Sequence, residues 1–254
     1  MLLLHGWLGS WELWRDTIEV LGREFRTYAL DFFGFGSSGL VGEDAEDELA
    51  RLEAFTVPTY VEMVYQFMER LGIKKAPLIG HSMGGTVSLS MAIAHPEKVV
   101  KVCVIGSPIN GSSLALLLKL SGNPTLASIF WLFGGKGLLV FLRFYSYLMA
   151  KDGQAMSQMI TSDVSKISME SFFQSIGTLR KTDLREALPS IKMPTMGMYG
   201  KRDIIVRPSE NKTLLAGVPH AQIEWFPDAG HFIMMDSPDR FITTLRDWLH
   251  VKQP

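Results

Sequence analysis

The sequence predicts an α/β fold: a mostly parallel sheet of about six strands, flanked by helices, with an inserted helical cap. Short apolar runs alternate with helical segments, each apolar run ends at Gly, Asp, Ser or Pro, and one long block has no strand signal. Such alternation is typical of a parallel sheet that helices cover on both faces. The expected strands are residues 2–4, 25–30, 76–79, 99–105, 195–199 and 222–225.

Composition narrows the class of protein. The 254 residues are 47% hydrophobic and carry a formal net charge of −1, so no excess of basic residues is available to bind nucleic acid. The single cysteine, Cys103, excludes an intrachain disulfide and a cysteine-based zinc site. Residues 120–135 are uncharged but fall short of the roughly 18 apolar residues of a membrane-spanning helix. We expect a compact soluble protein of the cytoplasm.

Helical segments follow the apolar runs. Residues 59–71 place apolar side chains at the three–four spacing of one buried helix face. Pro58 precedes this run, and Thr59 with Glu62 fits a capping box that would satisfy the first free amides. Similar reasoning predicts helices after Ser82 and over residues 238–249.

Residues 108–189 interrupt the alternation with apolar helical stretches and glycines. In open α/β sheets, ligands bind at the carboxyl ends of the strands, and an insertion between two strands can lie over that edge. We therefore expect a core of residues 1–107 and 190–254, with residues 108–189 as a cap or lid.

The strongest chemical signal is a G-x-S-x-G pattern centred on Ser82, within Gly80-His81-Ser82-Met83-Gly84-Gly85. It follows an expected strand and precedes a helix-compatible run. A nucleophile on a sharp strand-to-helix turn needs small neighbours, and the helix amino terminus favours the oxyanion of acyl transfer. This context predicts that Ser82 is a nucleophile.

Two further residues follow later strands. Asp203 lies just after the strand at 195–199, and His231 lies just after the strand at 222–225. The order Ser, Asp, His is the one a hydrolytic triad has on such a sheet, with His231 as base and Asp203 as its orienting acid. Asp228 is the rival acid, but it shares a turn with His231 and is poorly placed to reach the far ring nitrogen.

An oxyanion hole is expected from two backbone amides, those of Trp7 and Met83. Trp7 follows His5-Gly6 at the end of the first expected strand, and Met83 follows the nucleophile. We assign His5 to support of this loop, because His231 better fits the position of the base.

The chain resembles the α/β-hydrolase superfamily, in its cap-bearing serine esterase and lipase-like branch. The resemblance implies Ser82 as nucleophile, His231 as base and Asp203 as acid, and a structural role for the loop at 31–38. The residues that carry it are His5-Gly6-Trp7, residues 31–38, residues 80–85, Asp203 and Gly230-His231-Phe232.

The sequence departs from this family at its start. Relatives carry an antiparallel strand pair before the His-Gly segment, whereas only four residues precede His5. The antiparallel strands are therefore expected to be absent. We expect residues 2–4 to lie near a sheet edge that a loop, a helix or a second copy of the chain covers, because a bare edge offers unpaired amides.

The predicted activity is hydrolysis of a small-molecule carboxylic ester, with an apolar acyl group because the cap is rich in aromatic residues and poor in charge. No cofactor or metal motif accompanies a strand. Carbon–carbon hydrolysis of ring-cleavage products, thioesterase or lactonase activity, and a slow-turnover ligand sensor remain alternatives. Dehalogenases and epoxide hydrolases are disfavoured because their nucleophile is aspartate. The expected substrate pocket is lined by His81, Phe130, Trp131, Phe133 and Phe144.

Overall fold

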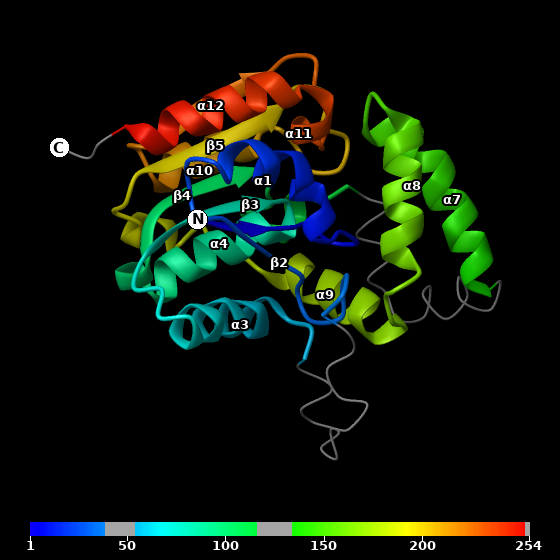
Figure 1. The fold of residues 1–254 in the computed structure, drawn as a ribbon, viewed down its shortest axis with the longest axis horizontal. Helices are drawn as coiled ribbons and strands as arrows, with labels where there is room; N and C mark the ends of the chain where they lie inside the picture. The colour runs from blue at the N-terminus through cyan, green and yellow to red at the C-terminus, as the bar shows by residue number, and fades with distance from the viewer. Residues whose placement is uncertain (39–53, 116–133, 252–254) are drawn as a thin grey trace.

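Strands at the centre of the molecule form one parallel sheet, and the predicted fold class is confirmed (Figure 1). The computed structural model describes residues 1–38, 54–115 and 134–251. In this part of the chain the sheet has six strands in the order β2-β1-β3-β4-β5-β6. The strands are β1 (Leu2–Leu4), β2 (Tyr28–Leu30), β3 (Ala76–His81), β4 (Val99–Ile105), β5 (Thr195–Gly200) and β6 (Gln222–Phe226).

The first strand lies inside the sheet, which corrects the expectation that residues 2–4 lie near an edge. Leu3 pairs with Ala29 of β2 on one side and with Ile79 of β3 on the other. All three leucines of β1 are fully buried. Their continuous apolar run is typical of a strand covered on both faces. Within the described residues, the edge strands are β2 and β6.

Two local boundaries differ from the prediction. The expected strand at 25–30 begins only at Tyr28, because the amide of Phe25 bonds back to the carbonyl of Leu21 at the end of α1. The first helix after β2 begins at Val57, and its N-cap is Thr56, whose hydroxyl accepts from the amide of Thr59. The predicted Thr59–Glu62 capping box is therefore wrong: proline is tolerated in the first helical turn, so Pro58 does not delay the start.

Helices cover both faces of the sheet. Helices α1 (Arg15–Leu21) and α12 (Pro238–His250) contact each other on one face, and α3 (Val57–Arg70) and α4 (Met83–Ala94) do so on the other (Figure 1). Helix α10 (Glu210–Gly217) contacts β5. The short helices are η1 (Trp11–Trp14), η2 (Pro96–Lys98), η3 (Gly111–Ser113), η4 (Leu188–Ser190) and α11 (Ile233–Asp236).

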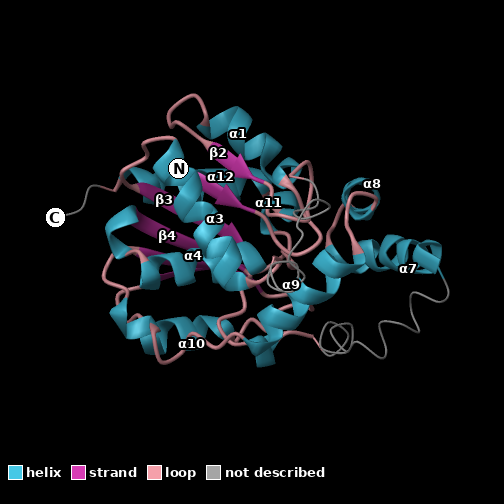
Figure 2. Ribbon diagram, turned by 90° about the horizontal axis from the view of Figure 1, so that it is seen from below, coloured by secondary structure: helices cyan, strands magenta, loops and turns pink. Residues whose placement is uncertain are grey.

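The insertion between β4 and β5 is helical where it is described. It contains α7 (Gly134–Met149), α8 (Gly153–Val164) and α9 (Met169–Lys181). Helices α7 and α8 contact each other and lie beyond the carboxyl ends of the strands, the ends at which the arrowheads point (Figure 2). No helix in the three described ranges has the length and apolar character needed to cross a bilayer.

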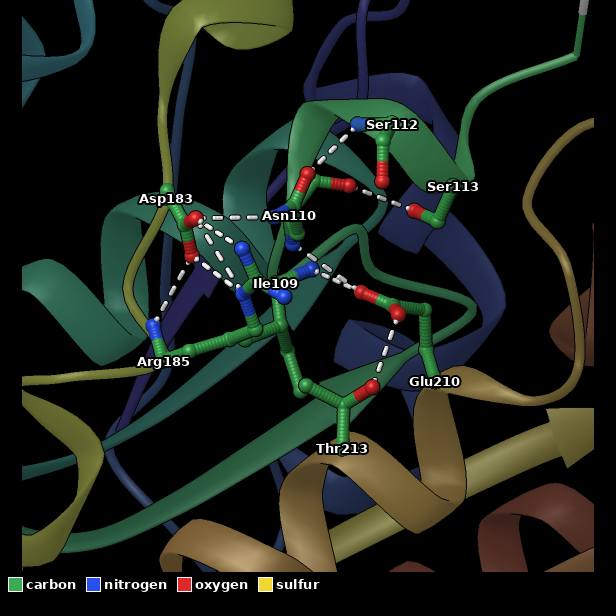
Figure 3. A network of polar contacts seen from close by, with 8 residues as sticks. All are labelled: Ile109, Asn110, Ser112, Ser113, Asp183, Arg185, Glu210 and Thr213. Carbon is green, nitrogen blue, oxygen red and sulfur yellow. Dashed lines mark hydrogen bonds and ion pairs between the residues drawn. The ribbon is translucent and has the colours of Figure 1, made fainter.

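The two ends of the insertion are fastened to each other (Figure 3). The amide of Leu184 donates to the carbonyl of Ile109 at 3.0 Å, and the Asn110 side chain donates to the Asp183 carboxylate at 2.8 Å. Buried Glu210 accepts from the amides of Ile109 and Asn110, at 2.6 and 3.0 Å. We call these residues, 109–110, 183–184 and Glu210, the insertion root.

Candidate active site

Ser82 occupies a sharp turn between β3 and α4. Its backbone has φ 51° and ψ −119°, a left-handed conformation that is costly for a residue with a side chain. The Ser82 amide donates to the carbonyl of Ile105 in β4 at 2.9 Å, which fixes the turn against the neighbouring strand. A Cβ on Gly80 would overlap the backbone of Gly84, so the small residues of the motif are needed for close packing.

Asp203 and His231 form a buried pair. The Nδ1 atom of His231 lies 2.8 Å from Oδ2 of Asp203, and the two side chains are only 4% and 2% exposed. The other carboxylate oxygen accepts from the amides of Ile205 and Val206, at 2.8 and 3.0 Å. These donors hold the carboxylate in place, and the carboxylate orients the imidazole. Asp228, in contrast, is 71% exposed and pairs with Arg202.

Gly106 brings the pair next to the serine turn. It directly follows Ile105, which binds the Ser82 amide, and its φ is 53°. A Cβ at this position would lie 3.1 Å from Oδ2 of Asp203 and 3.2 Å from Nδ1 of His231. The sequence analysis missed this residue, although a glycine directly after a strand was a usable signal.

The loop after β1 packs against the serine turn. A Cβ on Gly6 would lie 3.0 Å from the Cβ of Ser82. The amides of Trp7 and Met83 donate to no acceptor within the described part of the chain. The Trp7 indole donates to the carbonyl of Phe172 in α9 at 3.2 Å, and the two rings lie 4.6 Å apart. Helix α9 of the insertion therefore contacts the loop after β1 through Phe172.

His5 has both ring nitrogens engaged. Nδ1 donates to the carbonyl of Gly6 at 2.7 Å, and Nε2 accepts from the amide of Phe32 at 3.0 Å. Burial lowers the pKa of His5 to about 4, so the ring stays neutral and ties two loops together. In the second loop, the Asp31 carboxylate accepts from the amides of Trp11 and Ser37.

His81 is buried behind the site and does not face an open surface. Its Nε2 donates to the carbonyl of His231 at 3.0 Å. Burial, and next the neighbouring His231, hold the pKa of His81 well below its usual range, so the ring is a neutral donor. The expected pocket role does not fit this position, because the ring packs between the serine turn and the His231 loop.

Phe144, another expected pocket residue, lies on the surface of the insertion. Phe144 lies on α7 with 73% of the residue exposed, because that helix turns Leu142 and Ser146 inward instead. Phe130, Trp131 and Phe133 lie outside the described residues.

Asp236 joins the His231 loop to the insertion. One of its carboxylate oxygens accepts from the amide of Gly230 and the other from the amide of Lys151, both at 2.7 Å. The residue is 8% exposed. Nearby Tyr145 of α7 has a raised pKa, through burial first and the charge of Asp203 second. The end of α7 is therefore in electrostatic and hydrogen-bonding contact with the site.

Chemically, the site presents a hydroxyl, an oriented imidazole and two unengaged amides. In the described ranges, no group of three or more His, Cys, Asp or Glu residues is placed to hold a metal ion. This set of groups matches the requirements of acyl transfer: a nucleophile, a base with its orienting acid, and donors for an oxyanion.

Known proteins resemble this chain in sequence and in fold. A family model described as the alpha/beta hydrolase fold matches residues 1–238. The chain is 25% identical to a pimeloyl-[acyl-carrier protein] methyl ester esterase of Vibrio atlanticus, over 96% of this chain and 92% of the relative. It is 27% identical to a 2-hydroxy-6-oxo-6-phenylhexa-2,4-dienoate hydrolase of Burkholderia cepacia, over 98% and 87% of the two chains. An esterase from Exiguobacterium antarcticum superposes with a TM-score of 0.81 at 18% identity, over 98% of this chain and 90% of that chain.

The chain belongs to the alpha/beta hydrolase fold family. The resemblance predicted from its motifs is thereby confirmed, and the protein is a hydrolase.

Proposed function

We propose that the protein is a serine hydrolase that cleaves carboxylic esters through an acyl-enzyme intermediate. The observation that carries the proposal is the buried His231–Asp203 pair, 2.8 Å apart, beside the strained turn of Ser82. The esterase named among the relatives supports the same reaction class.

In the first step, the Ser82 hydroxyl attacks the ester carbonyl carbon, and Nε2 of His231 takes its proton. Asp203 stabilises the imidazolium through Nδ1. The amides of Trp7 and Met83 donate to the oxyanion, which gains stabilisation only as negative charge develops. The tetrahedral intermediate then collapses, His231 gives the proton to the leaving alcohol, and the acyl group stays on Ser82.

In the second step, His231 removes a proton from water, and the resulting attack on the acyl-enzyme releases the acid and restores Ser82. The insertion acts as a cap over this chemistry. Apolar Phe172 packs on half-buried Trp7, whose loop lies against the serine turn, and this supports an apolar acyl group.

The first test is Ser82→Ala, assayed on p-nitrophenyl esters from acetate to palmitate. Loss of the nucleophile should lower kcat by about 10³-fold or more, with an unchanged circular dichroism spectrum. The wild type should also release a burst of p-nitrophenol if deacylation limits the rate. A Ser82→Ala variant with near-normal esterase activity would place the site elsewhere.

Carbon–carbon hydrolysis is the second candidate, because a relative at 27% identity is a 2-hydroxy-6-oxo-6-phenylhexa-2,4-dienoate hydrolase. Assay of the wild type on such a vinylogous diketone distinguishes the two. Turnover of the diketone with inactivity on every ester would favour the second candidate.

A further inference from the structure

Helix α7 exposes a continuous apolar stripe. Val140, Phe144, Tyr147 and Leu148 are 67%, 73%, 63% and 60% exposed. Their spacing of four, seven and eight residues from Val140 puts them on one side of the helix. We call these four residues the α7 face. Neither α8 nor the sheet covers it.

The helix packs through its opposite side. Leu142 is 8% exposed and Ser146 is fully buried. The Ser146 hydroxyl lies 2.6 Å from the carbonyl of Arg143 and 3.1 Å from that of Gly153 at the start of α8. The α7 face is therefore an apolar side of the helix that remains exposed after the opposite side has packed against the protein. Large exposed apolar patches of this kind mark interaction sites.

The charge on α7 indicates what binds there. Lys136 and Arg143 are the helix's charged residues, and both are basic. Arg143 is exposed, three residues after Val140 and four before Tyr147, so it borders the α7 face. An aromatic and aliphatic stripe bordered by a basic side chain such as Arg143 suits a helix that lies in a membrane interface. Anionic headgroups complement the charge, and the acyl region receives the apolar side chains.

A second copy of the chain fits this surface less well. A symmetric contact through the α7 face would bring Arg143 of one copy towards Arg143 of the other, and α7 has no acidic residue to offset the charge. Helix α7 also lies on the outer side of the molecule, where a flat surface can reach it (Figures 1 and 2).

We propose that the α7 face docks the protein on an anionic lipid surface. The docking is peripheral, with the helix in the plane of the interface. The carboxyl ends of the strands, where Ser82 and His231 lie, are on the side of the molecule that carries α7. Docking through the α7 face therefore turns this side towards the lipid. The proposal does not rest on ester hydrolysis, and the test below measures binding alone.

The test is co-sedimentation of the full chain with phosphatidylcholine vesicles, with and without phosphatidylglycerol. The wild type should bind the anionic vesicles more tightly than the neutral ones, and less tightly as salt is raised. Phe144→Ser should weaken binding by about tenfold. Leu71→Ser is the matched control, since Leu71 is 52% exposed at the end of α3, and it should bind like the wild type. Arg143→Glu should weaken binding to the anionic vesicles only.

Melting temperatures of all variants confirm that each one is folded. Absence of wild-type binding to anionic vesicles, or equal losses in Phe144→Ser and Leu71→Ser, would overturn the proposal. So would a concentration-dependent dimer in analytical ultracentrifugation that Phe144→Ser converts to monomer, because the occupant would then be a second copy. Hydrolysis of a soluble ester, measured without vesicles, reports on the proposed reaction independently.

Discussion

At the scale of single residues, the site depends on backbone positions that few side chains tolerate. Ser82 has a positive φ, and Gly106 has a positive φ and stands against the Asp203–His231 pair. The conformation of Ser82 costs free energy that the surrounding contacts must offset, whereas glycine adopts a positive φ without this cost. The amides of Ile205 and Val206 donate to the Asp203 carboxylate and hold it in one orientation.

Asp203→Asn should lower kcat on p-nitrophenyl butyrate by about 10³- to 10⁴-fold. An amide in place of the carboxylate can favour the wrong imidazole tautomer, and it does not stabilise the imidazolium. Asp228→Asn is the control, because Asp228 is 71% exposed and pairs with Arg202, and it should retain activity within about twofold. The opposite ranking of the two variants would show that Asp228 is the acid.

At the scale of elements, the His231 loop is held on two sides. His81, at the end of β3, donates to the carbonyl of His231, and Asp236 of α11 accepts from the amide of Gly230. Because Asp236 also accepts from Lys151, just after α7, movement of the insertion and the position of His231 are mechanically linked.

Asp236→Asn should lower kcat about tenfold and leave KM nearly unchanged. The amide keeps one acceptor oxygen but loses the other, so either Gly230 or Lys151 loses its partner. The pH dependence of kcat/KM should also change, because the substitution removes a negative charge beside the His231 loop. Asp239→Asn is the control, because Asp239 is exposed in the first turn of α12. A variant that loses melting temperature but keeps kcat and the pH profile would assign Asp236 a structural role only.

At the scale of the whole molecule, the insertion meets the core through a buried carboxylate. Asp163 of α8 is 1% exposed and lies beside Ser10, Glu12 and Asp31 of the core. Burial raises the pKa of Asp163 from 3.8 to about 6. The Ser10 hydroxyl and, next, Lys166 lower the pKa, whereas the acidic neighbours Glu12 and Asp31 raise it.

Because its folded-state pKa exceeds the unfolded value, Asp163 binds a proton more tightly in the folded state. Its contribution to stability is therefore fullest below the unfolded pKa of 3.8 and is lost as pH rises through about 6. Asp163→Asn should raise the free energy of unfolding by about 2 kcal/mol at pH 7.5 relative to its effect at pH 4. Urea unfolding of both proteins across this range measures the difference. A pH-independent difference would show that Asp163 does not titrate on folding.

The sequence predicted features that depend on local chemistry. Apolar runs ending at turn residues located the strands, and the small residues around Ser82 located the sharp turn. Contacts between residues far apart in the sequence were not predicted. Nothing near Leu3 indicates that Tyr28–Leu30 will pair on its outer side, and nothing near Asp236 indicates that Lys151 will reach it. The aromatic content of the cap also did not show where Phe144 points, because α7 is apolar on both sides and the packing of α8 decides which side faces inward.

The insertion root has an evolutionary consequence. The insertion leaves the core near Ile109 and rejoins it near Leu184, and these residues are hydrogen bonded to each other. Because hydrogen bonds join the two ends, the entropic cost of closing the intervening loop rises only slowly as the loop becomes longer. Helices can therefore be lengthened, lost or exchanged at this point like a replaceable module, while strand pairing stays intact. Natural selection can in this way diversify what the molecule recognises without moving Ser82, Asp203 or His231.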